Sequence, residues 1–382
     1  MQRPLRLLMV TWELQPDSGW GRYSLGLLRG LREHHTEVVA LTARASATPD
    51  VGVEVIPCLS TPLSPLDRPQ AFGWNMLQVL RRARVYDHVH FVVEPYALAA
   101  SLTFPRPHVI TVHGTYGVVP LRGNPATRVL FSRTMRRAGA VACVSQFTRD
   151  RVHQALPLDN LVVINNGLEL PNARADEGQE HAPIAGDPVL MGVGGLKPRK
   201  GYHVVVEALP AVRERYPDVR YYLVGDDRDR KYVDGLRKRI GSLGLESNVT
   251  ITGRVDEAYL DALYRRCDVF VLTPVNSGAA FEGFGLTYLE AGAYGKPVLG
   301  SYNCGAEDAV QHEQNGLLAP QGDVDEVAAC LLRLLDDRAE AARMGERGRE
   351  MALARDWVNV AGEYRAVYDR VLGDRVLGPD GA

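Results

Sequence analysis

The most informative stretch of the sequence lies in its second half and reads Phe281-Glu282-Gly283-Phe284-Gly285-Leu286-Thr287-Tyr288-Leu289-Glu290-Ala291. It places two carboxylates, Glu282 and Glu290, eight positions apart. Glycine lets the backbone approach a neighbour closely, and the residues from Leu286 onward have helical spacing, so a helix is predicted to start near Gly283–Gly285. Eight residues at the helical rise span about 12 Å, which puts one carboxylate at the mouth of the helix and the other about two turns deeper.

This spacing matches the length of a nucleotide sugar, in which hexose, diphosphate and ribose follow one another. The free amides at a helix start suit a diphosphate, because the helix dipole favours negative charge there. Glu282 would then accept hydrogen bonds from sugar hydroxyls, and Glu290 from the ribose diol. A bare pair of glutamates at this spacing is more often a helix-start residue and an exposed side chain. The surrounding Glu-Gly-Phe-Gly and Leu-Glu-Ala favour the binding interpretation.

On both sides of this segment, short β-branched runs alternate with longer helical stretches, which predicts parallel sheets with helical crossovers. The alternation is interrupted at Pro171–Asp187, a segment rich in Pro, Gly, Ala and acids that is the natural linker. We therefore expect an amino-terminal domain at 1–170, a linker at 171–187, a carboxyl-terminal domain at 188–355 and a final helix within 356–382 that returns to the first domain. Two doubly wound units place a ligand at the carboxyl ends of their strands, in the crevice where the units face each other.

The size and composition of the chain narrow the classes of function. Its 382 residues favour two domains, and hydrophobic and charged fractions of 46% and 24% are ordinary for a globular protein. The net charge of −2 gives no global field that would recruit nucleic acid or anionic lipid. The five cysteines include no Cys-x-x-Cys pair, which favours a reducing compartment and argues against a zinc site. With neither a signal peptide nor a bilayer-spanning apolar run, a cytoplasmic location is expected.

The whole pattern resembles the family-4 retaining glycosyltransferases, whose GT-B fold consists of two Rossmann-like domains facing across a cleft. The family's Glu-x7-Glu signature matches Glu282 and Glu290, and the likeness runs from Val10 to about Leu335. It implies that Glu282 contacts the transferred sugar and that Glu290 contacts the ribose, in agreement with the spacing argument. The expected reaction is a metal-independent transfer of a hexosyl unit, with retention, from a nucleotide-diphosphate sugar and with no further cofactor.

A basic turn follows a predicted strand and opens a helix, and it reads Gly194-Gly195-Leu196-Lys197-Pro198-Arg199-Lys200-Gly201. Cations there would hold a diphosphate and stabilise the charge that grows as it leaves. In the family this loop carries an Arg and a Lys on the diphosphate. Lys200 matches the Lys, whereas Gly195 stands where the Arg is expected. Arg199 or Lys197 is the expected substitute, and a solvated basic turn is the favoured alternative for Lys197.

Two elements of the first half are expected at the same site. The imidazole of His113 ends a predicted strand, where it would bond a sugar hydroxyl or steady charge at the anomeric centre. A lone histidine at a strand end is more often structural, but His113-Gly114 resembles the cleft histidine of the family. The loop Gly19-Trp20-Gly21 lies between the first strand and the first helix and resembles the family's glycine-rich loop. Trp20 either stacks on an acceptor sugar or packs as an ordinary loop aromatic.

The complete set of predicted site residues has three parts. The catalytic residues are Glu282, His113 and Lys200. The donor-binding residues are Arg199, Gly283, Phe284, Gly285, Leu286, Glu290 and Val255. The acceptor or phosphate loop is Gly19, Trp20 and Gly21. Val255 follows a strand end where the family contacts the base mainly through backbone, so the sequence does not specify the base.

Several positions in the second half differ from the pattern of this family, and others resemble a motif of a different transferase fold. Cys304 replaces a loop glycine, and Asp308 stands near an expected Glu. Asp227-x-Asp229 and Asp323-x-Asp325 resemble metal-binding pairs of another transferase fold. They are interpreted as a hydrophilic loop and a helix start, so no metal site is predicted.

The expected partners are a nucleotide-diphosphate sugar and an acceptor that is a glycan, a lipid-linked sugar or a small metabolite; no nucleic acid is expected. Phe72–Arg84 combines aromatic and aliphatic residues with a basic end, a composition that suits the inner face of a membrane. An ordinary docked helix is the favoured interpretation of that segment. A sugar-nucleotide epimerase or a phosphorylase on the same fold is an alternative function. A non-catalytic nucleotide-sugar binder is another, prompted by Gly195 and Cys304.

Overall fold

The computed structural model describes residues 3–16, 18–46, 50–61, 68–100, 107–170 and 183–376. Residues 171–182, most of the predicted linker Pro171–Asp187, lie outside this part of the chain. The chain divides into two compact units. Unit 1 comprises Met1–Glu169 with Arg355–Ala382, and unit 2 comprises Leu170–Ala354.

Unit 1 contains a sheet of seven strands in the order β3-β2-β1-β4-β5-β6-β7. Every neighbouring pair is parallel. The central strands are apolar and almost entirely buried, as expected for a parallel sheet with both faces covered. The strands are β1 Leu5–Val10, β2 Thr36–Ala43, β3 Glu54–Leu59, β4 His88–Phe91, β5 His108–Val112, β6 Ala140–Cys143 and β7 Leu161–Val163.

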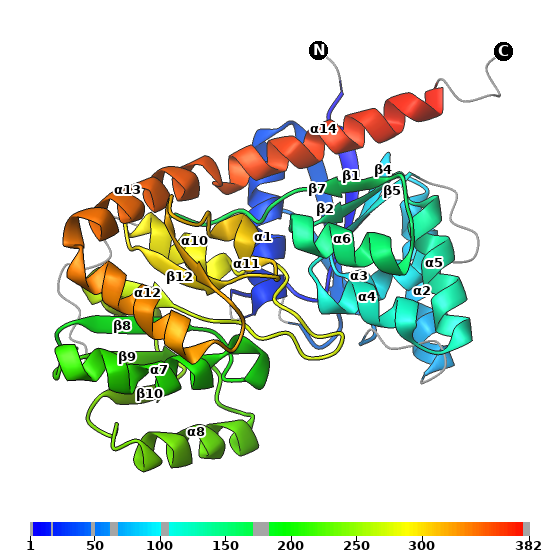
Figure 1. Cartoon of the computed structure of the whole chain (residues 1–382). Helices are drawn as coiled ribbons and strands as arrows, with labels where there is room; N and C mark the ends of the chain where they lie inside the picture. Colours follow the sequence, from blue (N-terminus) through cyan, green and yellow to red (C-terminus); the bar gives the residue numbers. More distant parts are fainter. Residues whose placement is uncertain are drawn as a thin grey trace. The chain divides into compact units, whose positions relative to one another are not determined.

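Helices cover both faces of this sheet (Figure 1). Parallel crossovers are right-handed, so the step from β1 to β2 places α1 on one face, and the steps from β3 through to β7 place α2–α6 on the other. The carboxyl-terminal helix α14 packs along α1. The helices are α1 Gly19–Glu33, α2 Pro69–Ala83, α3 Glu94–Ala97, η1 Leu98–Ala100, α4 Thr115–Arg122, α5 Pro125–Arg137, α6 Gln146–Ala155 and α14 Trp357–Val376.

Unit 2 repeats the same design with a sheet of six parallel strands in the order β10-β9-β8-β11-β12-β13. The strands are β8 Val189–Val193, β9 Arg220–Val224, β10 Val249–Gly253, β11 Val269–Val271, β12 Val298–Ser301 and β13 Gly316–Ala319. The helices are η2 Pro198–Lys200, α7 Tyr202–Arg215, α8 Arg230–Ser242, α9 Glu257–Arg266, α10 Leu286–Ala293, α11 Ala306–Ala309, α12 Val324–Asp336 and α13 Arg338–Ala354.

The predicted class, two doubly wound α/β units with parallel sheets, is confirmed, and the structure adds elements that the sequence pattern did not reveal. The strand β3 contains Pro57 and has several part-exposed residues. Such a strand is tolerated at a sheet edge but has a weak sequence pattern. The helix α13 is rich in Ala, Gly and Arg, so its buried stripe consists mostly of small residues around Met344. In both cases the tertiary position, rather than local hydrophobicity, produces the element.

Across the described residues, none of the helices combines the length and the apolar character that crossing a bilayer requires.

Candidate active site

The carboxyl ends of the unit 2 strands gather the predicted donor-binding residues. All six strands run parallel, so the loops that follow them lie along one edge of the sheet. The loop after β8 carries Arg199 and Lys200, the turn after β10 carries Val255, and the long loop after β11 carries Glu282. The predicted residues of the carboxyl-terminal half therefore share one edge of unit 2.

Glu282 lies at the centre of a small charged cluster on this edge. Its carboxylate atom Oε2 is 2.7 Å from Nζ of Lys200 and 2.9 Å from Nη1 of Arg199. Glu282 itself is 8% exposed. Within the described residues, no hydrogen bond or ion pair engages the second carboxylate oxygen, Oε1. One oxygen thus holds two cations and the other is available as an acceptor.

The charge of Glu282 results from two opposing effects. Burial raises the pKa of its carboxyl, because desolvation disfavours the ion, while the charges of Lys200 and Arg199 lower it. The cations prevail, and the pKa of Glu282 lies below its ordinary value. At neutral pH the side chain is a carboxylate that accepts hydrogen bonds, and it has no proton to donate.

The backbone around Lys200 holds this side chain against Glu282. Gly201 has a φ of 73°, and a Cβ on it would lie 1.6 Å from the carbonyl oxygen of Thr273. Only glycine fits there, so the chain turns sharply directly after Lys200. The Tyr202 hydroxyl donates to the carbonyl of Gly194 at 2.8 Å, which ties the start of α7 to the other end of the same loop.

The start of α10 has the features of an anion site. Its N-cap is Gly285, with a φ of 86° and no side chain to cap the helix. The amide of Tyr288 donates to the Gly285 carbonyl at 3.0 Å. In the part of the chain that the structure describes, the amides of Leu286 and Thr287 have no acceptor, and the buried hydroxyl of Thr287 has no partner. These donors would suit the oxygens of a phosphate.

The predicted helix start near Gly283–Gly285 is confirmed, because Gly285 is the N-cap of α10. The prediction that all eight residues from Glu282 to Glu290 follow the helical rise is wrong. α10 begins at Leu286, so Glu282 precedes it in non-helical chain and Glu290 lies in its second turn. A neighbouring turn explains this: the amide of Gly305 donates to the carbonyl of Glu282 at 2.9 Å. A Cβ on Gly305 would lie 2.0 Å from the carbonyl oxygen of Gly283. The residues before α10 are therefore bound to the loop after β12 and cannot join the helix.

The second signature glutamate, Glu290, is held by a tyrosine. The Tyr264 hydroxyl donates to its Oε2 at 2.8 Å. Tyr264 itself stacks on Tyr294, with ring centroids 5.1 Å apart. The predicted donor residue Phe284 is 3% exposed. Its ring lies in the core, so only its backbone is available to a ligand.

The basic loop shows which cation accompanies Lys200. Arg199 contacts Glu282, as given above, whereas Lys197 lies beside Gly195: its Cε would be 3.6 Å from a Cβ built on that glycine. The φ of Gly195 is not in the left-handed region, and no atom comes closer to such a Cβ. The backbone therefore does not require glycine at position 195, and a side chain there has room.

In unit 1, His113 follows β5 and has a defined tautomer. Its Nε2 is 2.8 Å from the carbonyl oxygen of Val92, which can only accept, so the proton resides on Nε2 and the lone pair on Nδ1. Burial lowers the pKa of His113 to about 4. The ring of Tyr23 meets the imidazole edge-on, with centroids 4.6 Å apart. A neutral ring favours the predicted hydrogen bond to a hydroxyl over the predicted charge stabilisation.

A second buried glutamate, Glu94, supports the His113 loop and was not among the predicted residues. It is fully buried at the start of α3, and its Oε1 accepts the amide of His113 at 2.6 Å. Burial raises the pKa of Glu94 to about 7, partly offset by bonds from backbone amides, including those of His113 and Gly114. Its Oε2 has no partner within the described residues. The sequence did contain a signal for this residue, because Glu94 interrupts an apolar strand end directly before Pro95.

Behind His113, a chain of buried hydroxyls and imidazoles fixes the strand that carries it. Tyr364 of α14 shares a hydrogen bond with Tyr23 at 2.6 Å and one with Thr111 at 2.9 Å. Thr111 also bonds Nε2 of His90 at 2.8 Å, and Nδ1 of His90 bonds Tyr368 at 2.7 Å. A satisfied buried network of this kind makes a region rigid. The helix α14 is thus an integral part of the His113 site.

The predicted acceptor loop is also preorganised. A Cβ on Gly21 would lie 1.9 Å from the carbonyl oxygen of Gln15, whereas Gly19 faces open space. Trp20 packs between two aromatic rings, Trp12 at 6.4 Å and Tyr116 at 5.2 Å between centroids. Trp12 and Tyr116 were not predicted. Together the three rings, tilted against one another by 43° and 56°, form an aromatic cluster beside the predicted loop.

The residues that departed from the pattern have structural roles. Asp229 and Asp323, from the two Asp-x-Asp pairs, are N-caps that accept the amides of Tyr232 and Glu326. Within the described residues, no three His, Cys, Asp or Glu side chains gather to hold a metal. Cys304 is fully buried, and burial raises the pKa of its thiol to about 12. Asp229, Asp323 and Cys304 are therefore interpreted as structural residues.

Two family models match consecutive parts of the chain. The model described as "Glycosyltransferase Family 4" matches residues 18–170, and the one described as "Glycosyl transferases group 1" matches residues 174–351. The chain belongs to the family-4 glycosyltransferases of the GT-B fold.

Curated relatives of this glycosyltransferase include enzymes of Mycobacterium tuberculosis. The GDP-mannose-dependent alpha-(1-6)-phosphatidylinositol monomannoside mannosyltransferase is 32% identical over 266 residues, which cover 68% of this chain and 66% of the relative. The match thus spans just under two thirds of that relative's length. Glycogen synthase from the same organism is 27% identical over 403 residues, covering 95% of this chain and 94% of the relative.

Solved structures resemble the glycosyltransferase over almost its whole length. Anabaena Alr3699/HepE, crystallised with UDP and glucose, has a TM-score of 0.74 at 22% identity and covers 96% of this chain and 100% of its own. Sucrose-phosphate synthase from Thermosynechococcus elongatus has a TM-score of 0.77 at 22% identity, with coverage of 97% and 99%. At this identity the likeness shows the fold.

Proposed function

We propose that this glycosyltransferase moves a hexosyl unit from a nucleoside-diphosphate sugar to an acceptor hydroxyl, with retention at the anomeric carbon and without a metal. The observation that carries the proposal is the convergence of Lys200 and Arg199 on Glu282 beside the uncapped start of α10. The relatives include a GDP-mannose-dependent enzyme, and a similar solved structure contains UDP; both support a nucleotide-sugar donor.

The leaving group is assigned to unit 2. The diphosphate of the donor would take hydrogen bonds from the amides of Leu286 and Thr287, and the buried Thr287 hydroxyl adds a third donor. Lys200 and Arg199 supply positive charge on a loop whose backbone is fixed. Preorganised cations and amides stabilise the negative charge that grows on the departing phosphate. Glu290, held by Tyr264, would accept hydrogen bonds from the ribose, and Val255 would contact the base through backbone.

The sugar is assigned to Glu282 and His113, which act as acceptors. The free oxygen of Glu282 would receive a hydroxyl, and the low pKa of this residue keeps it ionised. The Nδ1 lone pair of His113 would receive another, because its Nε2 proton is committed to Val92. Glu94 positions His113 through the backbone amide and does not itself touch the sugar.

Retention follows if the acceptor attacks from the side that the leaving group vacates. The bond between the anomeric carbon and the phosphate oxygen breaks, a bond to the acceptor oxygen forms, and the acceptor proton passes to the departing phosphate. No protein base is needed in this scheme. The aromatic cluster of Trp12, Trp20 and Tyr116 is proposed to bind the acceptor, which is a glycan, a lipid-linked sugar or a small metabolite.

A product analysis tests the proposal. A panel of nucleotide sugars that includes GDP-mannose and UDP-glucose is screened by thermal shift, and the best donor is then incubated with each acceptor class. We expect nucleoside diphosphate release that depends on acceptor, and a product whose anomeric proton signal shows the donor's configuration. An inverted product would contradict the proposal, and so would conversion of the donor into an isomeric nucleotide sugar without any acceptor; the latter result identifies an epimerase.

A further inference from the structure

Unit 1 carries an unbalanced basic surface on the outer side of two helices. The basic face consists of Arg128, Val129, Arg133, Arg136 and Arg137 on α5 with Trp74 and Leu77 on α2. All seven are exposed. Both helices lie on the same side of the sheet and pack against η1 (Figure 1). The residues that α2 buries, such as Val79 and Ala83, lie on its opposite side, so α2 is docked and still presents the face.

The charge of these two helices runs against that of the whole chain. Residues 69–84 and 125–137 contain seven arginines and no Lys, Asp or Glu. The net charge of the chain is −2, so the remainder of the chain carries −9. A local field of this sign persists within a Debye length of the surface even though the molecule as a whole repels anions.

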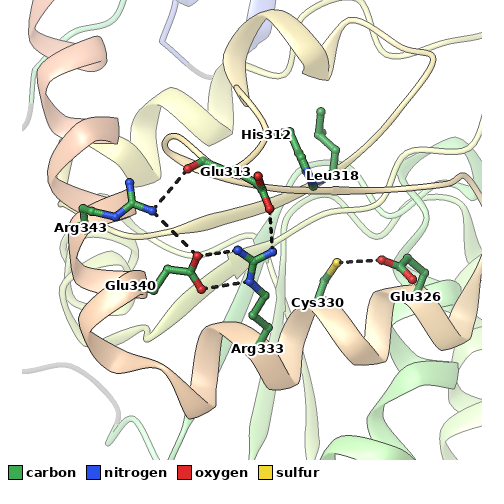
Figure 2. Close-up of polar contacts among 8 residues, drawn as sticks. All are labelled: His312, Glu313, Leu318, Glu326, Cys330, Arg333, Glu340 and Arg343. Carbon is green, nitrogen blue, oxygen red and sulfur yellow. Dashed lines mark hydrogen bonds and ion pairs between the residues drawn. The ribbon is translucent and has the colours of Figure 1, made fainter.

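Within the described residues, the four arginines of the basic face differ from several exposed arginines of unit 2 that are paired with carboxylates. Within the described residues, no carboxylate lies within ion-pair distance of any of the four on α5. On unit 2, by contrast, Arg333 is 3.1 Å from Glu313 and 2.5 Å from Glu340, and Arg343 is 3.9 Å from Glu340 (Figure 2). The arginines of unit 2 named here are already neutralised by neighbouring carboxylates. The arginines of the basic face are not, so they are available to bind an external anion.

Apolar side chains on the same face indicate what that anion belongs to. Leu77 is 40% exposed, Trp74 is 36% exposed, and Val129 beside Arg128 is 62% exposed. The Trp74 indole donates to the carbonyl of Cys58 at 2.7 Å, so its ring is held in place at the surface. Exposed aliphatic and indole groups between arginines fit the interface of a bilayer, where the apolar parts enter the acyl boundary and the guanidinium groups meet phosphates.

We propose that the basic face docks unit 1 on a bilayer that contains anionic phospholipids. A nucleic acid would use the charge but would leave Leu77 and Val129 without a function. The inference does not depend on the proposed catalytic chemistry, because none of these residues belongs to the donor or acceptor site.

A vesicle assay tests the docking. Full-length protein is mixed with vesicles of phosphatidylcholine alone or of phosphatidylcholine with phosphatidylglycerol, and bound protein is measured by flotation without donor or acceptor. We expect binding only to the anionic vesicles and a decline as salt rises. Each arginine near an anionic surface contributes about fivefold in affinity, so the triple variant Arg128→Gln/Arg133→Gln/Arg136→Gln should bind roughly a hundredfold more weakly.

A matched control removes the same number of positive charges from the surface of unit 2 where the arginines are paired with carboxylates. The variant Arg333→Gln/Arg343→Gln/Arg347→Gln changes three exposed, ion-paired arginines of unit 2 and should keep wild-type vesicle binding. Equal losses in both variants would show a net-charge effect and overturn the assignment. So would unchanged binding of the α5 variant, or binding to a single-stranded oligonucleotide without binding to anionic vesicles. Acceptor-dependent release of nucleoside diphosphate, measured on separate aliquots of the same variants, keeps this outcome separate from that of the catalytic proposal.

Discussion

Two buried glutamates, Glu282 in unit 2 and Glu94 in unit 1, stand near the carboxyl ends of parallel strands and yet have opposite acid–base properties. Burial raises the pKa of both. At Glu282 two cations at 2.7 and 2.9 Å outweigh burial and the pKa falls below its ordinary value. At Glu94 burial is offset by backbone amides alone among the described residues, and the pKa reaches about 7. The neighbours, and not the depth of burial, decide the charge.

The difference separates two functions of the same side chain. A carboxylate that is held ionised beside cations can bind hydroxyls and keep the cations in place until a diphosphate arrives. A carboxyl that is neutral below pH 7 fixes a loop by accepting amides and carries no permanent charge near the substrate. This comparison predicts which substitutions alter chemistry and which alter stability.

The largest effect is expected from Glu282→Gln. The amide keeps the shape but removes the charge that orders Lys200 and Arg199 and receives the sugar hydroxyl. We expect kcat to fall by roughly two to three orders of magnitude, as for the loss of a preorganised electrostatic group, with folding nearly intact. Steady-state kinetics with the best donor and a thermal melt measure the two effects.

Glu313→Gln is the matched control for that variant, because it removes an exposed glutamate that is paired with Arg333 on another surface of unit 2. It should keep wild-type turnover. Near-normal transfer by Glu282→Gln, or an equal loss in Glu313→Gln, would remove the central assignment.

Lys200→Met tests the cation side of the comparison. One charge-assisted contact contributes about 1.5–3 kcal/mol, so affinity for the nucleoside diphosphate should fall roughly 10- to 100-fold, with nucleoside affinity almost unchanged. Removing a cation also raises the pKa of Glu282, so the acid limb of kcat/KM should move to higher pH. Calorimetry with both ligands and a pH–rate profile check this.

Lys197→Met, on the same loop but beside Gly195, is the control and should bind both ligands normally. Equal losses of diphosphate and nucleoside affinity in Lys200→Met would mean that Lys200 supports the loop and not the phosphates.

Glu94→Gln tests the neutral glutamate through stability. Folding favours the protonated carboxyl, so its stabilising contribution is complete below pH 4.5 and is lost as the pH rises to about 7. That loss amounts to about 3 kcal/mol for a shift of this size. A permanently neutral Gln should remove this slope between pH 4.5 and about pH 7.

Denaturant unfolding followed by tryptophan fluorescence measures that slope in unit 1 alone. All four tryptophans, Trp12, Trp20, Trp74 and Trp357, lie in unit 1. An identical pH slope in wild type and Glu94→Gln would show that Glu94 is ionised throughout, and the contrast with Glu282 would disappear.

The features that could be predicted from the sequence are those that depend on residues close together in the chain. The alternation of strands and helices, the pair Glu282 and Glu290, and Lys200 in a turn that requires Gly201 all lie in short segments whose pattern is diagnostic by itself. Parallel strands then bring the loops to one edge without further information. This accounts for the confirmed fold and for the placement of the donor-side residues.

The features that could not be predicted depend on contacts between distant segments. Glu282 stays outside α10 because Gly305 binds its carbonyl, and nothing in residues 281–291 records that bond. The tautomer of His113 depends on Val92, and its support depends on Glu94. The ion pair that keeps Glu282 charged could not be predicted either, because Arg199 and Glu282 are 83 positions apart in the sequence.

The smallest expected effect is on the affinity for the nucleoside diphosphate, and it tests how the cations around Glu282 share their work. Gly195→Arg restores the residue that the family resemblance leads one to expect in the basic loop. The nearest atom to a Cβ at this position is Cε of the flexible Lys197, at 3.6 Å, and the backbone there does not require glycine. The added guanidinium should therefore fit without loss of stability and strengthen diphosphate binding by about three- to tenfold, because Lys200 and Arg199 already neutralise most of the charge. Titration of the nucleoside diphosphate measures the gain, with Gly195→Gln as the uncharged control. A gain far larger than tenfold would mean that Arg199 does not serve the diphosphate in the wild type and only balances Glu282.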